Sequence, residues 1–266
     1  MAARLVVLGG GKMGEALVAG LIEGHWATPE ELVVVEKVEA RRKELARAYP
    51  GLSVEAEPPP AQGVVVAVKP GDVEAACRAA AAAGVERALS IAAGVPLAKL
   101  EAWLGGDDAA VPVIRAMPNT PALVGAGAAA VAPGTHATDA DLAWAEEILS
   151  AVGVVVRLPE HLLDAVTGLS GSGPAYVFLV AEALIEAGVL VGLPRDVSRT
   201  LAIHTLLGSS RLLAESGDSP EALRAAVTSP GGTTAAGLRA LEDRGVRAAL
   251  LAAVAAATER SRQLGQ

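Results

Sequence analysis

A glycine-rich segment near the N-terminus has the residue types and spacing that bind a pyrophosphate. Residues 5–14 read LVVLGGGKMG, a short apolar run followed by G-x-G-x-x-G at Gly9, Gly11 and Gly14. Gly9 permits a tight turn, Gly11 lets the backbone approach the pyrophosphate, and Gly14 lets helix and strand pack closely. The helix expected next offers free N–H groups to an anion. In this strand-turn-helix context we expect dinucleotide binding rather than a purely structural turn.

Glu36 ends the second expected strand and bears on the choice of cofactor. It lies 36 − 14 = 22 residues past the last glycine of the motif. An acidic side chain there accepts hydrogen bonds from the adenosine ribose hydroxyls and repels a 2′-phosphate. Lys37, Arg41 and Arg42 follow closely and can hold a 2′-phosphate instead. A solvated charge at a strand end is the ordinary alternative, so the residues alone leave NADH and NADPH open.

Three further segments follow expected strands at the carboxyl edge of the sheet, where such folds bind ligands. Residues 64–70 read VVVAVKP and end in Lys69-Pro70, and residues 90–94 read SIAAG. Residues 117–121 read MPNTP and hold Asn119 between two prolines. Each segment can contact a cofactor or form an ordinary turn, and spacing alone does not decide.

Two clusters of small and hydroxyl residues occur in the second half of the chain. Residues 167–174 read TGLSGSGP, which fits either a ligand-facing kink or a plain helix cap. Residues 227–234 read VTSPGGTT, directly before an expected helix. A helix N-terminus binds a carboxylate without lysine or arginine, and Thr233 and Thr234 add hydroxyls. A simple N-cap loop needs one hydroxyl rather than four, so the second cluster favours an anion site.

Other chemistries find little support in the sequence. The four histidines, His25, His136, His161 and His204, are not at metal-ligand spacing with cysteine or carboxylates, so no metal site is predicted. Cys77 lies in an alanine-rich helix and is expected in the core. No G-x-S-x-G elbow or Walker loop is present, so hydrolase and kinase functions have no motif to support them.

The elements that must position these residues form two domains. Residues 1–157 alternate short apolar runs with helical patterns, which predicts a parallel α/β domain. Strands are expected at 5–8, 32–35, 64–68, 88–91, 111–116, 128–132 and 154–157, and helices at 13–23, 39–49, 73–83, 97–104 and 139–152. From residue 158 to 266 the pattern is all-α, with helices expected at 160–169, 175–191, 195–216, 220–227, 234–242 and 246–263. Several of these are apolar nearly all round, which predicts a subunit interface.

Composition narrows the function classes further. The 266 residues include 22 Lys+Arg and 30 Asp+Glu, with 52% hydrophobic and 2% aromatic residues. The negative charge and scarce aromatics disfavour nucleic acid as a partner. One cysteine and no signal-peptide pattern predict a cytoplasmic protein. The longest apolar stretches, such as 248–257 and 122–132, are shorter than the roughly 18 residues of a spanning helix, so no membrane span is predicted.

Taken together, the motifs resemble those of Δ1-pyrroline-5-carboxylate reductase over essentially the whole chain. The matching segments are residues 9–14, 67–70, 92–94, 115–121, 164–176 and 228–234, in the family's order and spacing. The last two are highly specific, whereas the glycine motif alone is not. The resemblance implies a Rossmann-type α/β dinucleotide-binding domain, residues 1–157, followed by a helical substrate-binding and dimerisation domain, residues 158–266.

The same resemblance implies an activity and a set of site residues. Reduced nicotinamide delivers hydride to the C=N carbon of a cyclic imino acid, 1-pyrroline-5-carboxylate, and L-proline is the product. Cofactor contacts fall on Gly9, Gly11, Lys12, Met13, Gly14, Glu36, Ala67, Val68, Lys69, Pro70, Ala92, Ala93 and Asn119. The substrate carboxylate lies on amides around Ser229, Gly231, Gly232 and Thr233, and Thr234 hydrogen-bonds the ring nitrogen as the catalytic residue. Glu36 departs from many relatives and favours NADH over NADPH.

Two other functions are weighed against this one. A β-hydroxyacid dehydrogenase shares the domain order. A resemblance to that family would imply a chemistry that depends on a lysine in the helical part, and no lysine follows Lys99. A non-catalytic dinucleotide sensor would leave the Ser229–Thr234 cluster without a purpose. The resemblance also implies a dimer formed by the helical domain, and some relatives assemble such dimers into rings.

Overall fold

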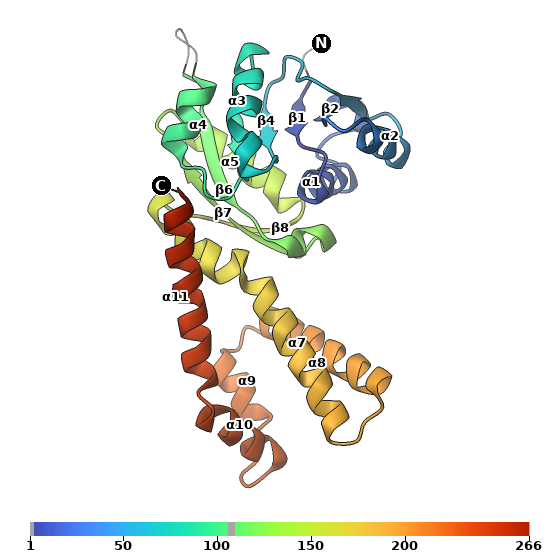
Figure 1. Ribbon diagram of the computed structural model, residues 1–266, viewed down its shortest axis with the longest axis vertical. Coiled ribbons are helices and arrows are strands. Elements are labelled where there is room, and N and C mark those ends of the chain that lie inside the picture. Colours follow the sequence, from blue (N-terminus) through green and yellow to red (C-terminus); the bar gives the residue numbers. More distant parts are fainter. Residues whose placement is uncertain (1–2, 106–109, 266) are drawn as a thin grey trace. The chain divides into compact units, whose positions relative to one another are not determined.

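The computed structural model describes residues 3–105 and 110–265 (Figure 1). Its contacts divide the chain into two compact units, Met1–Ser172 with Ala255–Gln266, and Gly173–Val254. This division falls after residue 172, whereas the sequence pattern places the domain boundary at 157/158. Three hydrogen bonds tie residues 160–164 to the first unit. Glu160 accepts hydrogen bonds from Arg115 and from the Leu97 amide, and the Ser261 hydroxyl donates to Asp164 at 2.6 Å.

The first unit contains one eight-stranded sheet in the order β3-β2-β1-β4-β5-β6-β7-β8. Its strands are β1 (Leu5–Leu8), β2 (Leu32–Val35), β3 (Ser53–Glu55), β4 (Val64–Val66), β5 (Ala88–Ser90), β6 (Val113–Met117), β7 (Gly127–Pro133) and β8 (Gly153–Arg157). Its α-helices are α1 (Lys12–Glu23), α2 (Glu39–Ala48), α3 (Val73–Ala82), α4 (Leu97–Leu104), α5 (Asp139–Ser150) and α6 (Leu163–Val166). Short 3-10 turns are η1 (Pro29–Glu31), η2 (Pro70–Asp72), η3 (Thr120–Val124) and η4 (Glu160–Leu162).

The sheet departs from the sequence prediction at two strands. The predicted parallel α/β sheet is observed, but β7 pairs antiparallel with β6, which the sequence pattern did not indicate. Only the short turn η3 joins these strands, and a parallel return needs a crossover of a dozen or more residues. The strand β3 was not predicted, because three residues reading SVE at the sheet edge carry little apolar signal.

Alternate residues of the strands face two separate layers of helices. Leu5, Val7 and the matching residues of neighbouring strands pack with α1 and α5 on one face. Val6 and Leu8 pack with α3 and α4 on the other face. This period-two burial on both faces explains why the strands read as continuous apolar runs. Helices therefore cover both faces of the sheet, and this packed core fixes the position of the carboxyl edge.

The second unit is entirely helical over its described residues. It contains α7 (Gly173–Leu190), α8 (Arg195–Glu215), α9 (Pro220–Ala226), α10 (Thr233–Asp243) and the start of α11 (Val246–Gly265). The helices α7 and α8 pack closely, and the Ser198 hydroxyl of α8 donates to the Ile185 carbonyl at 2.7 Å. In both units, every predicted strand and helix except 160–169 lies within two residues of its observed bounds.

The helical run over residues 160–190 is long and apolar enough, by length and composition, to cross a membrane. The sequence prediction of no span is therefore not confirmed. It considered only uninterrupted apolar stretches, whereas glycine, serine and acidic residues such as Glu182 and Glu186 interrupt this run. Residues 160–171 form η4, α6 and a π-helical turn, η5 (Thr167–Gly171), rather than the single helix expected there. Most large apolar side chains of α7 are exposed, including Phe178 at 63%.

Replacing Gly20 by alanine is expected to destabilise the first unit. A Cβ atom at Gly20 of α1 would lie 2.7 Å from the Ala151 carbonyl oxygen, just past α5. The overlap should lower the free energy of unfolding by ~1–3 kcal/mol in spite of alanine's higher helix propensity. Denaturant unfolding measures it, with Gly71→Ala as the control because nothing lies within 4 Å of that position. Equal stability of the two variants would contradict the close packing of α1 on α5.

Candidate functional site

The glycine motif forms the turn between β1 and α1 at the point where the strand order reverses. Gly9 has φ +108°, and a Cβ atom there would lie 2.6 Å from the Ala67 carbonyl oxygen. A Cβ atom at Gly14 would overlap the Gly9 carbonyl oxygen. At Gly11, by contrast, a Cβ atom would meet nothing within 4 Å. Gly9 and Gly14 are thus needed for packing, and Gly11 borders open space.

The start of α1 fits a pyrophosphate group. Gly11 is the N-cap residue, with φ −71° and ψ −179°, and no side chain caps the helix. The first N–H groups of a helix have no acceptor within the helix, so those of Lys12, Met13 and Gly14 are available to an anion. The open space beside Gly11 lies at the same end. These features suit a dinucleotide, and the β1/β4 switch point is where α/β sheets bind one.

The Glu36 carboxylate is held beside this turn by backbone amides. One oxygen accepts from the Gly10 amide at 3.1 Å, and the other accepts from the Val38 amide at 2.9 Å. The side chain is therefore an ordered part of the turn rather than a freely solvated charge. Its negative charge lies at the end of β2, next to the glycine motif.

The three basic residues that could hold a 2′-phosphate, Lys37, Arg41 and Arg42, already have hydrogen-bond or ion-pair partners. Arg41 donates to the Gly10 carbonyl at 2.8 Å and to Glu15, whose hydrogen bond raises the pKa of Arg41. Arg42 donates to the carbonyls of Glu36 and Lys37. Lys37 pairs with Asp72 at 3.3 Å on the exposed surface. Both arginines thus brace the loop after β2.

The predicted residues after β4 and β5 lie at the same edge of the sheet as the glycine motif. The Ala67 amide donates to the Leu8 carbonyl, so residues 67–70 begin directly beside the β1 turn. The Ile91 amide in turn donates to Val66, which brings residues 92–93 next to that loop. Lys69, Pro70 and Ala93 are exposed, whereas Ala92 is buried. The structure therefore brings these three predicted segments together.

Asn119, predicted as a cofactor contact, makes structural hydrogen bonds. Its carbonyl oxygen accepts from the Ala128 amide at 2.8 Å, and its amide donates to the Ser170 carbonyl at 3.1 Å. Ser170 belongs to the π-helical turn η5, an element that often occurs at functional sites. The sequence predicted neither the π-turn nor this bond, although the small-residue break at 167–174 was its signal. Asn119 thus anchors η5 to the start of β7.

The predicted substrate residues form the turn into α10 in the second unit. The Gly232 amide donates to the Ser229 carbonyl at 3.0 Å, and Gly231 has φ +68°. A Cβ atom at Gly232 would overlap the Ser229 hydroxyl and lie 3.2 Å from the Ser229 carbonyl oxygen, so a side chain here would have to displace that hydroxyl. No side chain caps α10, whose first residues are Thr233 and Thr234. Free amides and hydroxyls therefore gather at this helix N-terminus.

Comparisons with known proteins extend over the whole chain. Residues 160–264 match the family model described as pyrroline-5-carboxylate reductase dimerisation, and residues 4–94 match NADP oxidoreductase coenzyme F420-dependent. A Synechocystis pyrroline-5-carboxylate reductase is 46% identical over 100% of both chains. A solved reductase from Coxiella burnetii has TM-score 0.92 and 32% identity over 100% of both chains. A Plasmodium falciparum structure with NADP bound has TM-score 0.84 and 29% identity, covering 99% of this chain and 98% of its own.

Replacing Asn119 should loosen η5 specifically. Asn119→Ala removes both hydrogen bonds and is expected to lower the free energy of unfolding by ~1–3 kcal/mol. Amide hydrogen exchange should speed up at residues 167–172 and at Ala128. Asn119→Asp is the matched variant, because it keeps an acceptor for the Ala128 amide and loses only the donor to Ser170. Unchanged exchange at 167–172 in both variants would show that Asn119 does not hold η5.

Proposed function

Because this chain belongs to the pyrroline-5-carboxylate reductase family, we propose roles for its site residues in that reaction. The chain is an NAD(P)H-dependent oxidoreductase that reduces the C=N bond of 1-pyrroline-5-carboxylate to L-proline, the last step of proline biosynthesis. Similarity over the full length of both chains carries this conclusion. A β-hydroxyacid dehydrogenase or a non-catalytic sensor would not explain 46% sequence identity to a pyrroline-5-carboxylate reductase over the full length of both chains.

Our proposal for the cofactor assigns distinct tasks to the residues at the carboxyl edge of the sheet. The amides of Lys12, Met13 and Gly14 bind the pyrophosphate, and Gly9 and Gly11 leave room for it. The segments 67–70 and 92–93 line the path toward the nicotinamide. When bound, the reduced nicotinamide supplies the hydride for the reaction. Asn119 acts indirectly, by positioning η5.

For the substrate, the proposal places the carboxylate at the N-terminus of α10. The amides around Ser229, Gly231, Gly232 and Thr233 provide hydrogen bonds to an anion, and the helix dipole adds favourable electrostatics. The uncapped helix end and the glycine turn support this role. No lysine or arginine occurs within residues 228–234, so backbone amides have to supply the binding.

Thr234 is the proposed catalytic residue. An imine protonated on nitrogen is already electrophilic, so the site has no oxyanion to stabilise. Positioning can then supply most of the catalysis. The half-buried Thr234 follows the proposed carboxylate site by one residue. Its hydroxyl accepts a hydrogen bond from the iminium N–H and so orients the ring, while water completes the exchange of protons.

We further propose that NADH is preferred over NADPH. The Glu36 carboxylate is fixed beside the glycine turn, where it can accept from ribose hydroxyls and repel a 2′-phosphate. The partners of Lys37, Arg41 and Arg42 support this assignment, because a 2′-phosphate would have to displace them.

The chain self-associates through its helical part, which matches a dimerisation family over residues 160–264. The exposed apolar side chains of α7, such as Val177, Phe178 and Leu179, support contact with a second copy. We propose that this surface, rather than a lipid bilayer, accounts for the apolar run at 160–190. The proposal also includes a cytoplasmic protein without nucleic-acid partners, and a ring of dimers as the larger assembly.

The cofactor proposal predicts a clear preference in a kinetic assay. Consumption of NADH and NADPH should be followed side by side with pyrroline-5-carboxylate, and L-proline identified as the product. We expect a higher kcat/KM with NADH. Glu36→Gln should narrow the difference between the cofactors by about tenfold, because it removes the repulsive charge. If NADPH is the better cofactor, the role of Glu36 is wrong while the enzyme assignment stands.

The proposed role of Thr234 is tested by two substitutions. Thr234→Ala removes the hydroxyl and should lower kcat/KM by about tenfold or more, in line with loss of a hydrogen bond to a charged group. Thr234→Ser keeps the hydroxyl and should retain most of the activity. A Thr234→Ala variant within about twofold of the wild type has lost well under 1 kcal/mol, which would remove Thr234 from the mechanism.

A further inference from the structure

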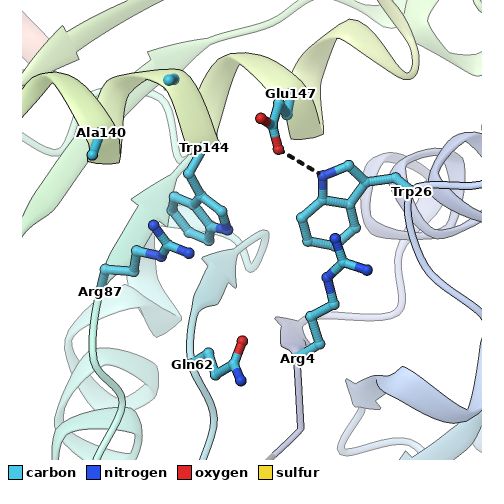
Figure 2. A pocket seen from close by; sticks show the side chains of 8 residues that line it. Arg4, Trp26, Gln62, Arg87, Ala140, Trp144 and Glu147 are labelled. Atoms are coloured by element: carbon cyan, nitrogen blue, oxygen red, sulfur yellow. Dashed lines mark hydrogen bonds between the residues drawn. The ribbon is translucent and has the colours of Figure 1, made fainter.

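A pocket lies at the amino edge of the sheet, opposite the edge that carries the glycine motif. Three adjacent strands each contribute a lining residue from just before their first residue: Arg4 before β1, Gln62 before β4 and Arg87 before β5. The pocket has a volume of about 380 Å³, and its remaining lining comes from Trp26 and from α5. Figure 2 shows these side chains facing one another across the pocket. The strands separate it from the glycine motif by ~13 Å, so the cofactor site does not include it.

The guanidinium of each arginine in this pocket lies over a tryptophan ring. The Arg4 guanidinium lies 4.1 Å from the centre of the Trp26 ring, and that of Arg87 lies 4.5 Å from the Trp144 ring. Trp144 is only 5% exposed and belongs to the core, so it forms a fixed base for Arg87. Cation–π stacking orients a guanidinium and leaves its N–H groups pointing outward in the plane.

The N–H donors of these two arginines are largely unused within the described structure. Arg4 pairs with Glu31 at 3.7 Å and Arg87 pairs with Asp141 at 3.8 Å. Both distances exceed the range of hydrogen bonds, so these pairs supply charge balance without consuming donors. A carboxylate is the group that a guanidinium binds best through two parallel hydrogen bonds. The pocket therefore offers donors for one.

Glu147 adds a site of opposite charge on the far side of the pocket. Its Oε2 atom accepts from the Trp26 indole N–H at 3.1 Å, which fixes the side chain and leaves Oε1 available to a cation. Glu31 and Asp141 lie outside the pocket lining and pair with the two arginines, so Glu147 brings the local balance to three carboxylates and two guanidiniums. A phosphate or dicarboxylate would add to this negative excess, whereas a zwitterion would not. The methyl groups of Ala140 and Ala143 complete the lining with an apolar surface.

We propose that this pocket binds a small α-amino acid. The ligand's carboxylate takes the donors of Arg87 and Arg4, its ammonium lies against Glu147, and a short apolar side chain lies against Ala140 and Ala143. L-Proline, the product of the reaction, is a ligand of this class. Its ring is apolar and its secondary ammonium carries two donors.

Tryptophan fluorescence provides the test, because two of the three tryptophans line the pocket. The intact protein would be titrated with L-proline, glycine, acetate and inorganic phosphate. L-Proline and glycine should change the emission at lower concentration than acetate or phosphate. Arg87→Gln should raise the Kd for L-proline at least about tenfold, because it removes a charged hydrogen-bond donor. Turnover of pyrroline-5-carboxylate should be unchanged in this variant, since Arg87 lies outside the catalytic site.

Two further variants keep the result interpretable. Glu147→Gln retains a hydrogen-bond acceptor for Trp26. It should raise the Kd for L-proline without changing the Kd for acetate. Arg78→Gln is the control, because Arg78 forms a surface pair with Glu74 on α3, away from the pocket. A fluorescence response that survives Arg87→Gln would place amino-acid binding at the catalytic site only and overturn the proposal. Tighter binding of phosphate than of either amino acid, or no response to any probe, would overturn it as well.

Discussion

The close approach of Gly9 to the Ala67 carbonyl is the constraint on which the cofactor edge depends. A side chain at Gly9 would separate β1 from the loop after β4, and one at Gly14 would push α1 away from the turn. With both absent, α1 begins directly at the strand end and its first amides remain uncapped. Both peptide groups of Gly10 are then bonded to side chains. Its amide donates to Glu36, and its carbonyl accepts from Arg41.

A similar device recurs in the helical unit. Gly231 and Gly232 allow the turn before α10 to fold back on Ser229, and no side chain caps the helix by a hydrogen bond. Two uncapped helix N-termini thus serve two anions in our account, the pyrophosphate at α1 and the substrate carboxylate at α10. This economy explains how an acidic chain binds anionic ligands with few dedicated cations.

Much of the fold follows from the sequence because its signals are local. The apolar runs of β1 and β2 and the proline and glycine breaks in the helical unit gave bounds close to those observed. Long-range contacts were beyond such reasoning. The antiparallel β7 depends on what a short connection permits, the role of Asn119 depends on Ser170 far along the chain, and the amino-edge pocket joins residues from 4 to 147. For the site, local motifs identified the segments, whereas the partners of each side chain required the structure.

The central claim is that backbone amides at the start of α10 bind the substrate carboxylate. The most direct measurement compares kcat/KM for 1-pyrroline-5-carboxylate with kcat/KM for 1-pyrroline, which lacks that group. Loss of several charged hydrogen bonds predicts a value at least about a hundredfold lower for 1-pyrroline. Equal values for the two imines would show that the carboxylate contributes nothing to the transition state, and would contradict the account.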